Sequence, residues 1–228
     1  DADNLDGGSG LSIFMVYKRN EMFADFAAVI QKRDIRGSDA AKQAWVLEQN
    51  GGSDPHQIQL VLTRDLFLRN GEEFNADDYY LINTDYSSSR GLALFNTNGV
   101  QQNALPYSKS ILSTEASVAI GGFQPMNLAE VIYYNQGLNS AQRTIVNNYL
   151  AVKYDLDLYD ENGNVVNIYD NQDYKFGLIG IGMEDSNNKH TYASGSALLL
   201  QESNSSLADG EYLMAGHNGG AIDDNEAW

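Results

Sequence analysis

At 228 residues, the chain is long enough to fold as one large β-domain or as two smaller ones with buried cores. It carries 31 acidic and 14 basic side chains, which give a formal net charge of −17. This charge repels phosphate backbones and anionic lipid, so we expect no nucleic acid partner and no membrane insertion. The chain has no cysteine, which excludes disulfides and thiol chemistry.

The first part of the sequence predicts short strands separated by polar turns. Leu11 to Tyr17 is apolar on both faces, which is typical of a central strand. Asn70-Gly71 stands between apolar runs and predicts a hairpin, and Asn98-Gly99 predicts another turn. Many short strands at near-regular spacing favour a β-sandwich over alternating βαβ units. The other predicted strands cover residues 26–31, 44–49, 57–63, 79–83, 91–95, 118–120 and 128–134.

One helix is predicted, over residues 140–153. Asn139 stands at its N-cap and Gln142 follows three residues later, the spacing of a capping box. Beyond the cap, apolar side chains recur at helical spacing and form one stripe. They are Ile145, Val146, Tyr149, Leu150 and Tyr154.

After the helix the composition becomes turn-rich and acidic. Asn162-Gly163 predicts a two-residue hairpin, and residues 165–169, 176–182 and 197–201 predict further strands. We therefore expect a first domain over 1–156 and a second β-rich module over 157–228. Because the chain opens on Asp without Met, we expect a piece of a longer protein.

The strand, turn and helix from 122 to 154 resemble the closing segment of laminin-G-like, concanavalin-type jelly rolls of large bacterial surface proteins. The resemblance includes Leu128 to Tyr134, the capped turn and the run Tyr149 to Tyr154. It implies an all-β, concanavalin-like jelly-roll sandwich with one closing α-helix, followed by part of a second β-module. It also implies an extracellular or cell-surface location and carbohydrate ligands. Gly180 to Asp185 and Leu213 to Gly219 resemble the β-module that commonly follows these jelly rolls, although Met183 stands where the family usually has Arg. Family members continue past this chain's end, which implies that the second module is truncated.

Some jelly rolls of this shape are glycoside hydrolases, which need two carboxylates on one face of the same strand. Glu130 stands alone on its predicted strand, and the adjacent pairs Glu72-Glu73 and Asp77-Asp78 point to opposite faces in a strand. We therefore expect no enzyme. A structural role for Glu130 is favoured over a ligand role, because a buried carboxylate must be paired.

A candidate calcium site lies after the helix. Asp160, Asn162 and Asn164, with Asp170 beyond, offer oxygen ligands at alternate positions, a pattern that Ca²⁺ favours. The twelfth position counted from Asp160 is Asn171 instead of Glu, which excludes a regular EF-hand. A solvated hairpin is the alternative. The acidic opening, residues 1–6, also has two interpretations, a cation site or a flexible terminus.

Aromatic side chains give the candidate ligand contacts, because an apolar ring face matches the C–H face of a pyranose. Those in or beside predicted loops are the candidates, with core packing as the alternative. They are Trp45, Tyr79, Tyr86 and Tyr107, with Tyr80 beside them.

The sequence thus predicts a non-catalytic extracellular recognition or adhesion module of a larger bacterial surface protein. Its expected partner is carbohydrate or another cell-surface polymer, bound by rim loops, with Ca²⁺ as the one candidate cofactor. The first alternative is a structural spacer or protein–protein interaction module of a surface filament or motility adhesin, in contact with neighbouring domains or chains. The second is a glycoside hydrolase.

Overall fold

The computed structural model describes residues 5–19, 26–34, 43–50, 57–71, 73–76, 78–121, 125–195, 198–204 and 206–220. Contacts within the chain divide it into two compact units, Asp1–Leu138 and Asn139–Trp228. The helix α1 (Ser140–Tyr154) belongs to the second unit by this division. The sequence analysis assigns the same helix to the first domain, with the boundary at residue 156.

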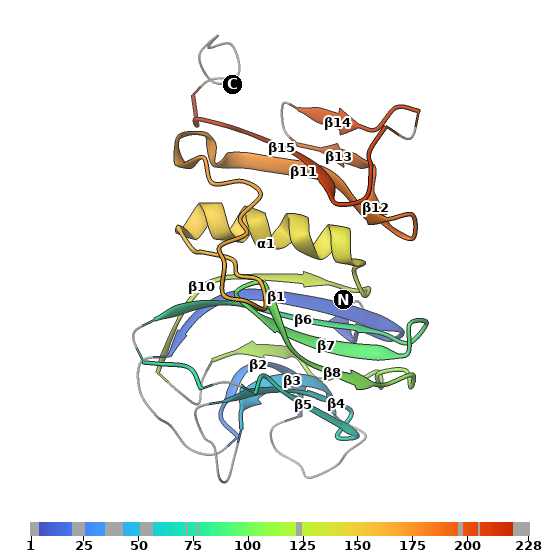
Figure 1. Cartoon of the computed structure of the whole chain (residues 1–228). Coiled ribbons are helices and arrows are strands. Elements are labelled where there is room, and N and C mark those ends of the chain that lie inside the picture. Colours follow the sequence, from blue (N-terminus) through green and yellow to red (C-terminus); the bar gives the residue numbers. More distant parts are fainter. Residues whose placement is uncertain are drawn as a thin grey trace. The chain divides into compact units, whose positions relative to one another are not determined.

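The first unit consists of two five-stranded antiparallel sheets that face each other (Figure 1). The β1 sheet has the order β10 (Met126–Tyr134), β1 (Gly10–Arg19), β6 (Tyr79–Ser87), β7 (Leu92–Thr97) and β8 (Val100–Pro106). The β3 sheet has the order β5 (Leu66–Arg69), β4 (Ile58–Leu62), β3 (Gln43–Gln49), β2 (Ala28–Arg33) and β9 (Val118–Ile120). The predicted sandwich is confirmed.

Strand register explains the core between the two sheets. In the β3 sheet, one row of paired residues consists of Ile30, Leu47, Leu60 and Leu68. In the β1 sheet, Leu11 pairs with Tyr86 and Met15 pairs with Ile82. All of these side chains are buried in one apolar cluster. Each fully buried apolar side chain contributes about 1.5–3 kcal/mol, so this cluster dominates the stability of the sandwich.

The structure contains the turn predicted at Asn98-Gly99 and lacks the hairpin predicted at Asn70-Gly71. Asn98 and Gly99 adopt φ of 49° and 89° and join β7 to β8, as predicted. The hairpin predicted at Asn70-Gly71 is wrong, because β5 and β6 belong to different sheets. The Asn70 side chain instead accepts a hydrogen bond from the Ile58 backbone at 3.0 Å and extends the β4–β5 ladder.

The second unit places a sheet between a helix and a hairpin (Figure 1). The sheet consists of β12 (Asn188–His190), β11 (Phe176–Asp185) and β15 (Glu211–His217), and the hairpin of β13 (Tyr192–Ser194) and β14 (Leu199–Gln201). A Cβ at Gly180 would lie 3.1 Å from Ile145 Cγ2 of α1, and one at Gly195 would lie 3.1 Å from Ile179 Cγ2 of β11. Glycine at both positions therefore permits this close packing.

The strand predicted over residues 165–169 is wrong. Only an isolated bridge forms there, between Tyr159 and Val165. The backbone N–H of Ile168 donates instead to Asn148 Oδ1 of α1 at 2.7 Å, and that of Leu158 donates to Asn167 Oδ1 at 2.7 Å. Side-chain amides thus take the bonds that a neighbouring strand would have supplied. A 3₁₀ turn, η3 (Gln172–Tyr174), follows before β11.

The capping box of α1 is confirmed, and its removal gives a first prediction. Asn139 Oδ1 accepts from the Gln142 backbone N–H, and Gln142 Oε1 accepts from the Asn139 backbone N–H, both at 3.0 Å. Asn139→Ala is expected to destabilise the second unit by about 1 kcal/mol, because it leaves an N-terminal donor unpaired. Asn139→Asp keeps the acceptor and is the matched control. Equal denaturant midpoints for Asn139→Ala and the wild type would contradict this prediction.

No helix in the described part of the chain is both long enough and apolar enough to cross a membrane.

Candidate functional site

The first unit has an open depression of about 380 Å³ at one end of the sandwich. This volume lies near the lower end of the range of small-molecule sites, roughly 300–1,000 Å³. Three segments that are far apart in sequence form it: the turn before β1, the loop before β9, and the turn after β10. Its lining residues are Asp6, Gly7, Gly8, Ser9, Ile111, Ser113 and Asn135.

The turn before β1 is fixed by backbone and aromatic contacts. The Gly10 N–H donates to the Gly7 carbonyl at 2.6 Å, and Gly7 has a φ of 85° that favours glycine. Trp45 Nε1 and the Tyr133 hydroxyl both donate to the Leu5 carbonyl, at 2.8 and 3.0 Å. Asp6 follows directly, so its carboxyl group is held in one place. The flexible-terminus interpretation therefore does not apply to Asp6, whereas residues 1–4 lie outside the described residues.

The charge of Asp6 is balanced within the fold. Asp6 Oδ1 lies 2.7 Å from Lys32 Nζ, and the two side chains are 7% and 0% exposed. Burial acts to raise the pKa of Asp6, but hydrogen bonds from Lys32, Ser113 and Thr114 outweigh it and hold that pKa below 3.8. The ammonium also donates to the Thr114 and Ala116 carbonyls, at 2.7 and 3.0 Å. These contacts account for all three Lys32 donors.

The loop before β9 supplies one apolar and one hydroxyl group. The Ile111 N–H donates to the Gly8 carbonyl at 2.7 Å, and the Ile111 side chain packs so close to Gly7 that a Cβ there would lie 2.9 Å from its Cδ1. Ser113 is exposed, and its hydroxyl donates to Asp6 Oδ2 at 2.6 Å. The Ser113 oxygen therefore presents its remaining lone pairs to the depression.

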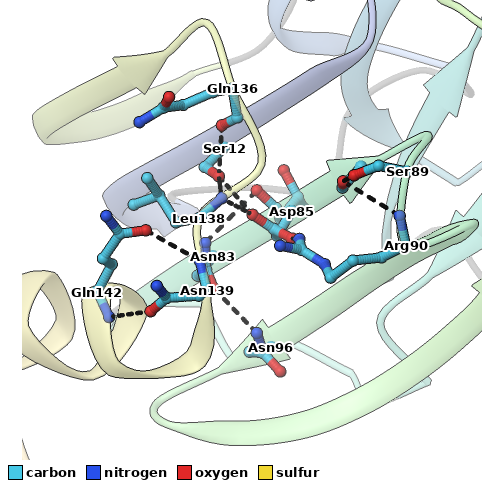
Figure 2. A network of polar contacts seen from close by, with 12 residues as sticks. Ser12, Asn83, Asp85, Ser89, Arg90, Asn96, Gln136, Leu138, Asn139 and Gln142 are labelled. Carbon is cyan, nitrogen blue, oxygen red and sulfur yellow. Dashed lines mark hydrogen bonds and ion pairs between the residues drawn. The ribbon is translucent and has the colours of Figure 1, made fainter. Parts of the chain in front are cut away.

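A buried polar network fixes the turn that carries Asn135 (Figure 2). Asp85, which is fully buried, accepts from the Ser12 hydroxyl, from the Leu138 N–H at 2.7 Å and from Arg90. The Ser12 hydroxyl is also 3.0 Å from the Gln136 carbonyl. Asn135, one residue before Gln136, is exposed. Its amide therefore stands on a rigid turn, as a preorganised binding group requires.

Three of the four aromatic residues that the sequence singles out lie in the core. Trp45, Tyr86 and Tyr107 are 1%, 0% and 8% exposed, which leaves their rings no face for a sugar. They support the depression instead: Trp45 donates to Leu5, and the Tyr86 hydroxyl donates to the Lys109 carbonyl just before Ile111. Tyr107 packs edge-on against Tyr86 at 5.4 Å between ring centroids.

Tyr79 is the one ring of these four that is exposed, at 41%. It pairs with Lys18 at one end of the β1–β6 ladder, whereas Ser87 pairs with Gly10 beside the depression at the other end. Eight residues of strand separate the two ends, about 26 Å at the usual rise per residue. The structure therefore does not bring the predicted aromatic residues together as one site.

The predicted calcium ligands form a hydrogen-bonded loop. Asp160 Oδ1 accepts from the Asn162 and Asn164 backbone N–H groups, both at 2.9 Å, and Oδ2 accepts from Asn164 Nδ2 at 2.9 Å. These bonds lower the pKa of Asp160 and are typical of a solvated Asx turn. Asp170 is exposed. Within the described ranges, no group of three or more His, Asp or Glu side chains could hold a metal ion.

The outer side of the β3 sheet carries a second polar cluster, around Glu48. Arg33 Nη1 lies 2.8 Å from Glu48 Oε2, and Gln59 Nε2 donates to Glu48 Oε1 at 3.0 Å. Burial raises the pKa of Glu48 despite these partners. Two rows of residues paired across the strands are described on this side. One row consists of Ala28, Glu48, Gln59 and Arg69, and the other of Gln31, Val46, Val61 and Phe67. They contain one carboxylate, so these rows lack the pair that glycoside hydrolysis uses.

The sequence gives weak signals for the residues that line the depression. Asp6-Gly7-Gly8 before an apolar strand is a turn signal, and nothing local marks Ser113 or Asn135. Glu130, the carboxylate that stands out in the sequence, lies half-buried in β10 opposite Val16 and does not line the depression.

The two facing antiparallel sheets give the first unit the fold that the sequence predicts, a concanavalin-like jelly-roll sandwich. No protein-family model matches the sequence, and no curated protein matches it.

Several solved structures resemble this chain. They include a Limulus polyphemus SAP-like pentraxin, with a TM-score of 0.45, 14% identity, and coverage of 61% of this chain and 70% of the pentraxin. Domain 4 of the Geobacillus stearothermophilus arabinanase AbnA, solved with arabinotriose, has a TM-score of 0.46 and 12% identity. That match covers 61% of this chain and 67% of the arabinanase domain. A Bacteroides ovatus protein has a TM-score of 0.46 and 13% identity. The match covers 57% of this chain and 38% of that protein.

Proposed function

We propose that the first unit is a non-catalytic carbohydrate-recognition module that binds sugar hydroxyl groups in the depression. The observation that carries this proposal is the set of residues that line the depression: the exposed polar residues Ser113 and Asn135, beside the apolar Ile111, with the buried Asp6 carboxylate bonded to the Ser113 hydroxyl. A few fixed polar groups beside an apolar surface are what a small-molecule site offers. Hydroxyl groups and the C–H face of a sugar match both kinds of surface.

The rigidity of the three segments supports this proposal. Each one is fixed by hydrogen bonds to the sandwich: Leu5 by Trp45, Ile111 by Gly8, and Leu138 by Asp85. A preformed site loses little conformational entropy when a ligand binds. Asp6 is the one carboxylate among the residues that line the depression, and Lys32 already pairs with it. Acid–base hydrolysis of a glycoside needs two carboxylates, so we propose that the sugar is bound without being cleaved.

The proposed setting is a secreted or cell-surface protein of bacteria, which follows from the family resemblance of residues 122–154. Calcium remains a prediction of the sequence. Its candidate loop, Asp160–Asn164, lies in the second unit and plays no part in the depression.

A glycan array followed by calorimetry on the bound sugars tests the proposal. Asn135→Ala and Ser113→Ala are each expected to weaken binding about 5- to 10-fold, the loss of one hydrogen bond of about 1–1.4 kcal/mol. Tyr79→Ala is the matched control, because Tyr79 is exposed at the other end of the β1–β6 ladder, and it should leave affinity unchanged.

Three results would contradict the proposal. Loss of binding in Tyr79→Ala with normal binding in Asn135→Ala would move the site to the end of the sandwich that the aromatic residue marks. Release of reducing sugar from a polysaccharide would establish an enzyme. No glycan binding, with tight association to a neighbouring polypeptide, would favour the spacer or interaction module.

A further inference from the structure

We infer that the depression selects uncharged, hydroxyl-rich glycans over acidic ones, and that Lys32 sets this preference from behind the site as a positioning residue. This inference rests on the proposed function and adds the chemical class of the ligand. Two independent features of the described residues carry it: the charge balance of Asp6, and the hydrogen-bonding character of the groups that face the ligand.

The charge of the site is balanced from within. Lys32 Nζ lies 2.7 Å from Asp6 Oδ1, and the lysine side chain is fully buried. The depression therefore contains a carboxylate whose charge is already offset at contact distance. A free carboxylate would attract cations, and a free ammonium would attract carboxylate, sulfate or phosphate groups. The pair strongly attracts neither, which leaves hydrogen bonding as the means of recognition.

The exposed Ser113 hydroxyl faces a ligand as a hydrogen-bond acceptor. The Ser113 hydroxyl proton is already committed to Asp6 Oδ2, so the oxygen offers lone pairs to a ligand. The carbonyls of Gly7, Gly8 and Ser9 are occupied by the N–H groups of Gly10, Ile111 and Ser88. A ligand must therefore donate to the exposed Ser113 Oγ, as a sugar hydroxyl group does. An ionised carboxylate or sulfate has no proton to donate.

The net charge of the chain and the other polar groups near the depression also disfavour acidic ligands. A net charge of −17 repels an anionic ligand as it approaches. Lys32 cannot reach out to such a ligand, because its three donors are held by Asp6, Thr114 and Ala116. Asn135 offers an amide N–H₂, which is a neutral donor and gives an acidic sugar no ion pair.

Matched pairs of glycans test the inference on the unaltered protein. The probes are lactose with sialyllactose, and cellotriose with its C6-oxidised uronic form. In each pair that binds, the neutral sugar is expected to bind at least about tenfold more tightly, equivalent to about 1.4 kcal/mol. The affinity for the neutral member should change less than about twofold between roughly 0.05 and 0.5 M NaCl, because no net charge is neutralised.

Asp6→Asn gives a second, opposite expectation. It keeps the size of the side chain and one acceptor oxygen but leaves the Lys32 charge unbalanced. The preference should therefore shift toward the acidic member of each pair by about tenfold. A melting curve of the variant establishes that it is folded, and Ser113→Ala, which keeps both charges, should retain the neutral preference.

The outcomes separate the inference from the function beneath it. If the unaltered protein binds the acidic member of a pair as tightly as the neutral one, the inference is overturned and the carbohydrate module stands. If folded Asp6→Asn shows the wild-type preference, Lys32 does not set specificity and that part is overturned. If neither member of any pair on the array binds, the proposed function itself fails, and the inference with it.

Discussion

Lys32→Met is expected to lower the free energy of unfolding of the first unit by about 3–5 kcal/mol. Removing one partner of a buried ion pair leaves the other charge without compensation, and such substitutions typically lower stability by about 3–5 kcal/mol. Asp6 and the Lys32 side chain are nearly inaccessible to water, so solvent does not replace the lost contact. Two backbone carbonyls, of Thr114 and Ala116, lose their donor as well. Chemical denaturation of the wild type and the variant measures the difference.

The double variant Lys32→Met with Asp6→Asn is the control for this prediction. It removes both charges together, and replacing a buried pair by neutral groups is often close to neutral in stability. We expect it to recover at least half of the loss. A double variant as unstable as Lys32→Met alone would show that the lysine stabilises the fold through packing or its carbonyl contacts, and that the ion pair contributes little.

The pH dependence provides a second measurement of the same pair. Because the folded-state pKa of Asp6 is below its ordinary value of 3.8, the contribution of the pair is present above that value. It is lost as the pH falls further, through the lowered pKa. The difference in stability between the wild type and Lys32→Met should therefore shrink in this acid range. A constant difference would mean that Asp6 does not titrate with the pair.

Trp45→Ala is expected to destabilise the first unit by a similar amount, about 3–5 kcal/mol, which is usual for removing a buried tryptophan. Trp45 is 1% exposed and stacks on Tyr133 with 5.5 Å between ring centroids. Its indole N–H also donates to the Leu5 carbonyl, beside Asp6. The substitution should therefore loosen the turn that carries Asp6 in addition to leaving a cavity. Thermal and denaturant unfolding, with glycan affinity measured on the folded protein, separate the two effects.

Trp45→Phe is the milder counterpart. It keeps most of the apolar volume and loses the bond to Leu5, so we expect a loss of about 1–2 kcal/mol and nearly normal glycan affinity. If Trp45→Ala is instead as stable as the wild type and has lost glycan binding, the indole contacts the ligand. That result would restore the role that the sequence analysis gives to Trp45.

The contrast between the two interpretations of Trp45 has a general physical cause. An aromatic residue beside a predicted loop has the same local sequence whether its ring faces the core or the solvent. Burial is decided by the opposite sheet, whose residues are distant in sequence: Tyr133 of β10 covers Trp45 of β3. Tyr86 is buried against Tyr107, which follows β8 of the same sheet. Propensity and spacing contain no information about these partners.

The sequence by itself determined the features that depend on local physics. Short strands at near-regular spacing predicted the sandwich, and the Asn98-Gly99 pair predicted a turn because both residues tolerate positive φ. Asn139 and Gln142 predicted the start of α1, because a capping box needs only residues three positions apart. These features require no knowledge of what packs against them.

Only the tertiary structure decided the candidate site. Asp6, Ser113 and Asn135 come from three segments of which the first and last are more than a hundred residues apart. The pairing of β1 with β10 and the hydrogen bonds of Ile111 to Gly8 and of Ser113 to Asp6 bring them together. Lys32 looks like an ordinary surface lysine in the sequence, yet the fold buries it against Asp6. The cost of burying a charge without a partner explains why the two must meet. The choice of partner is a property of the whole sandwich, and no local pattern encodes it.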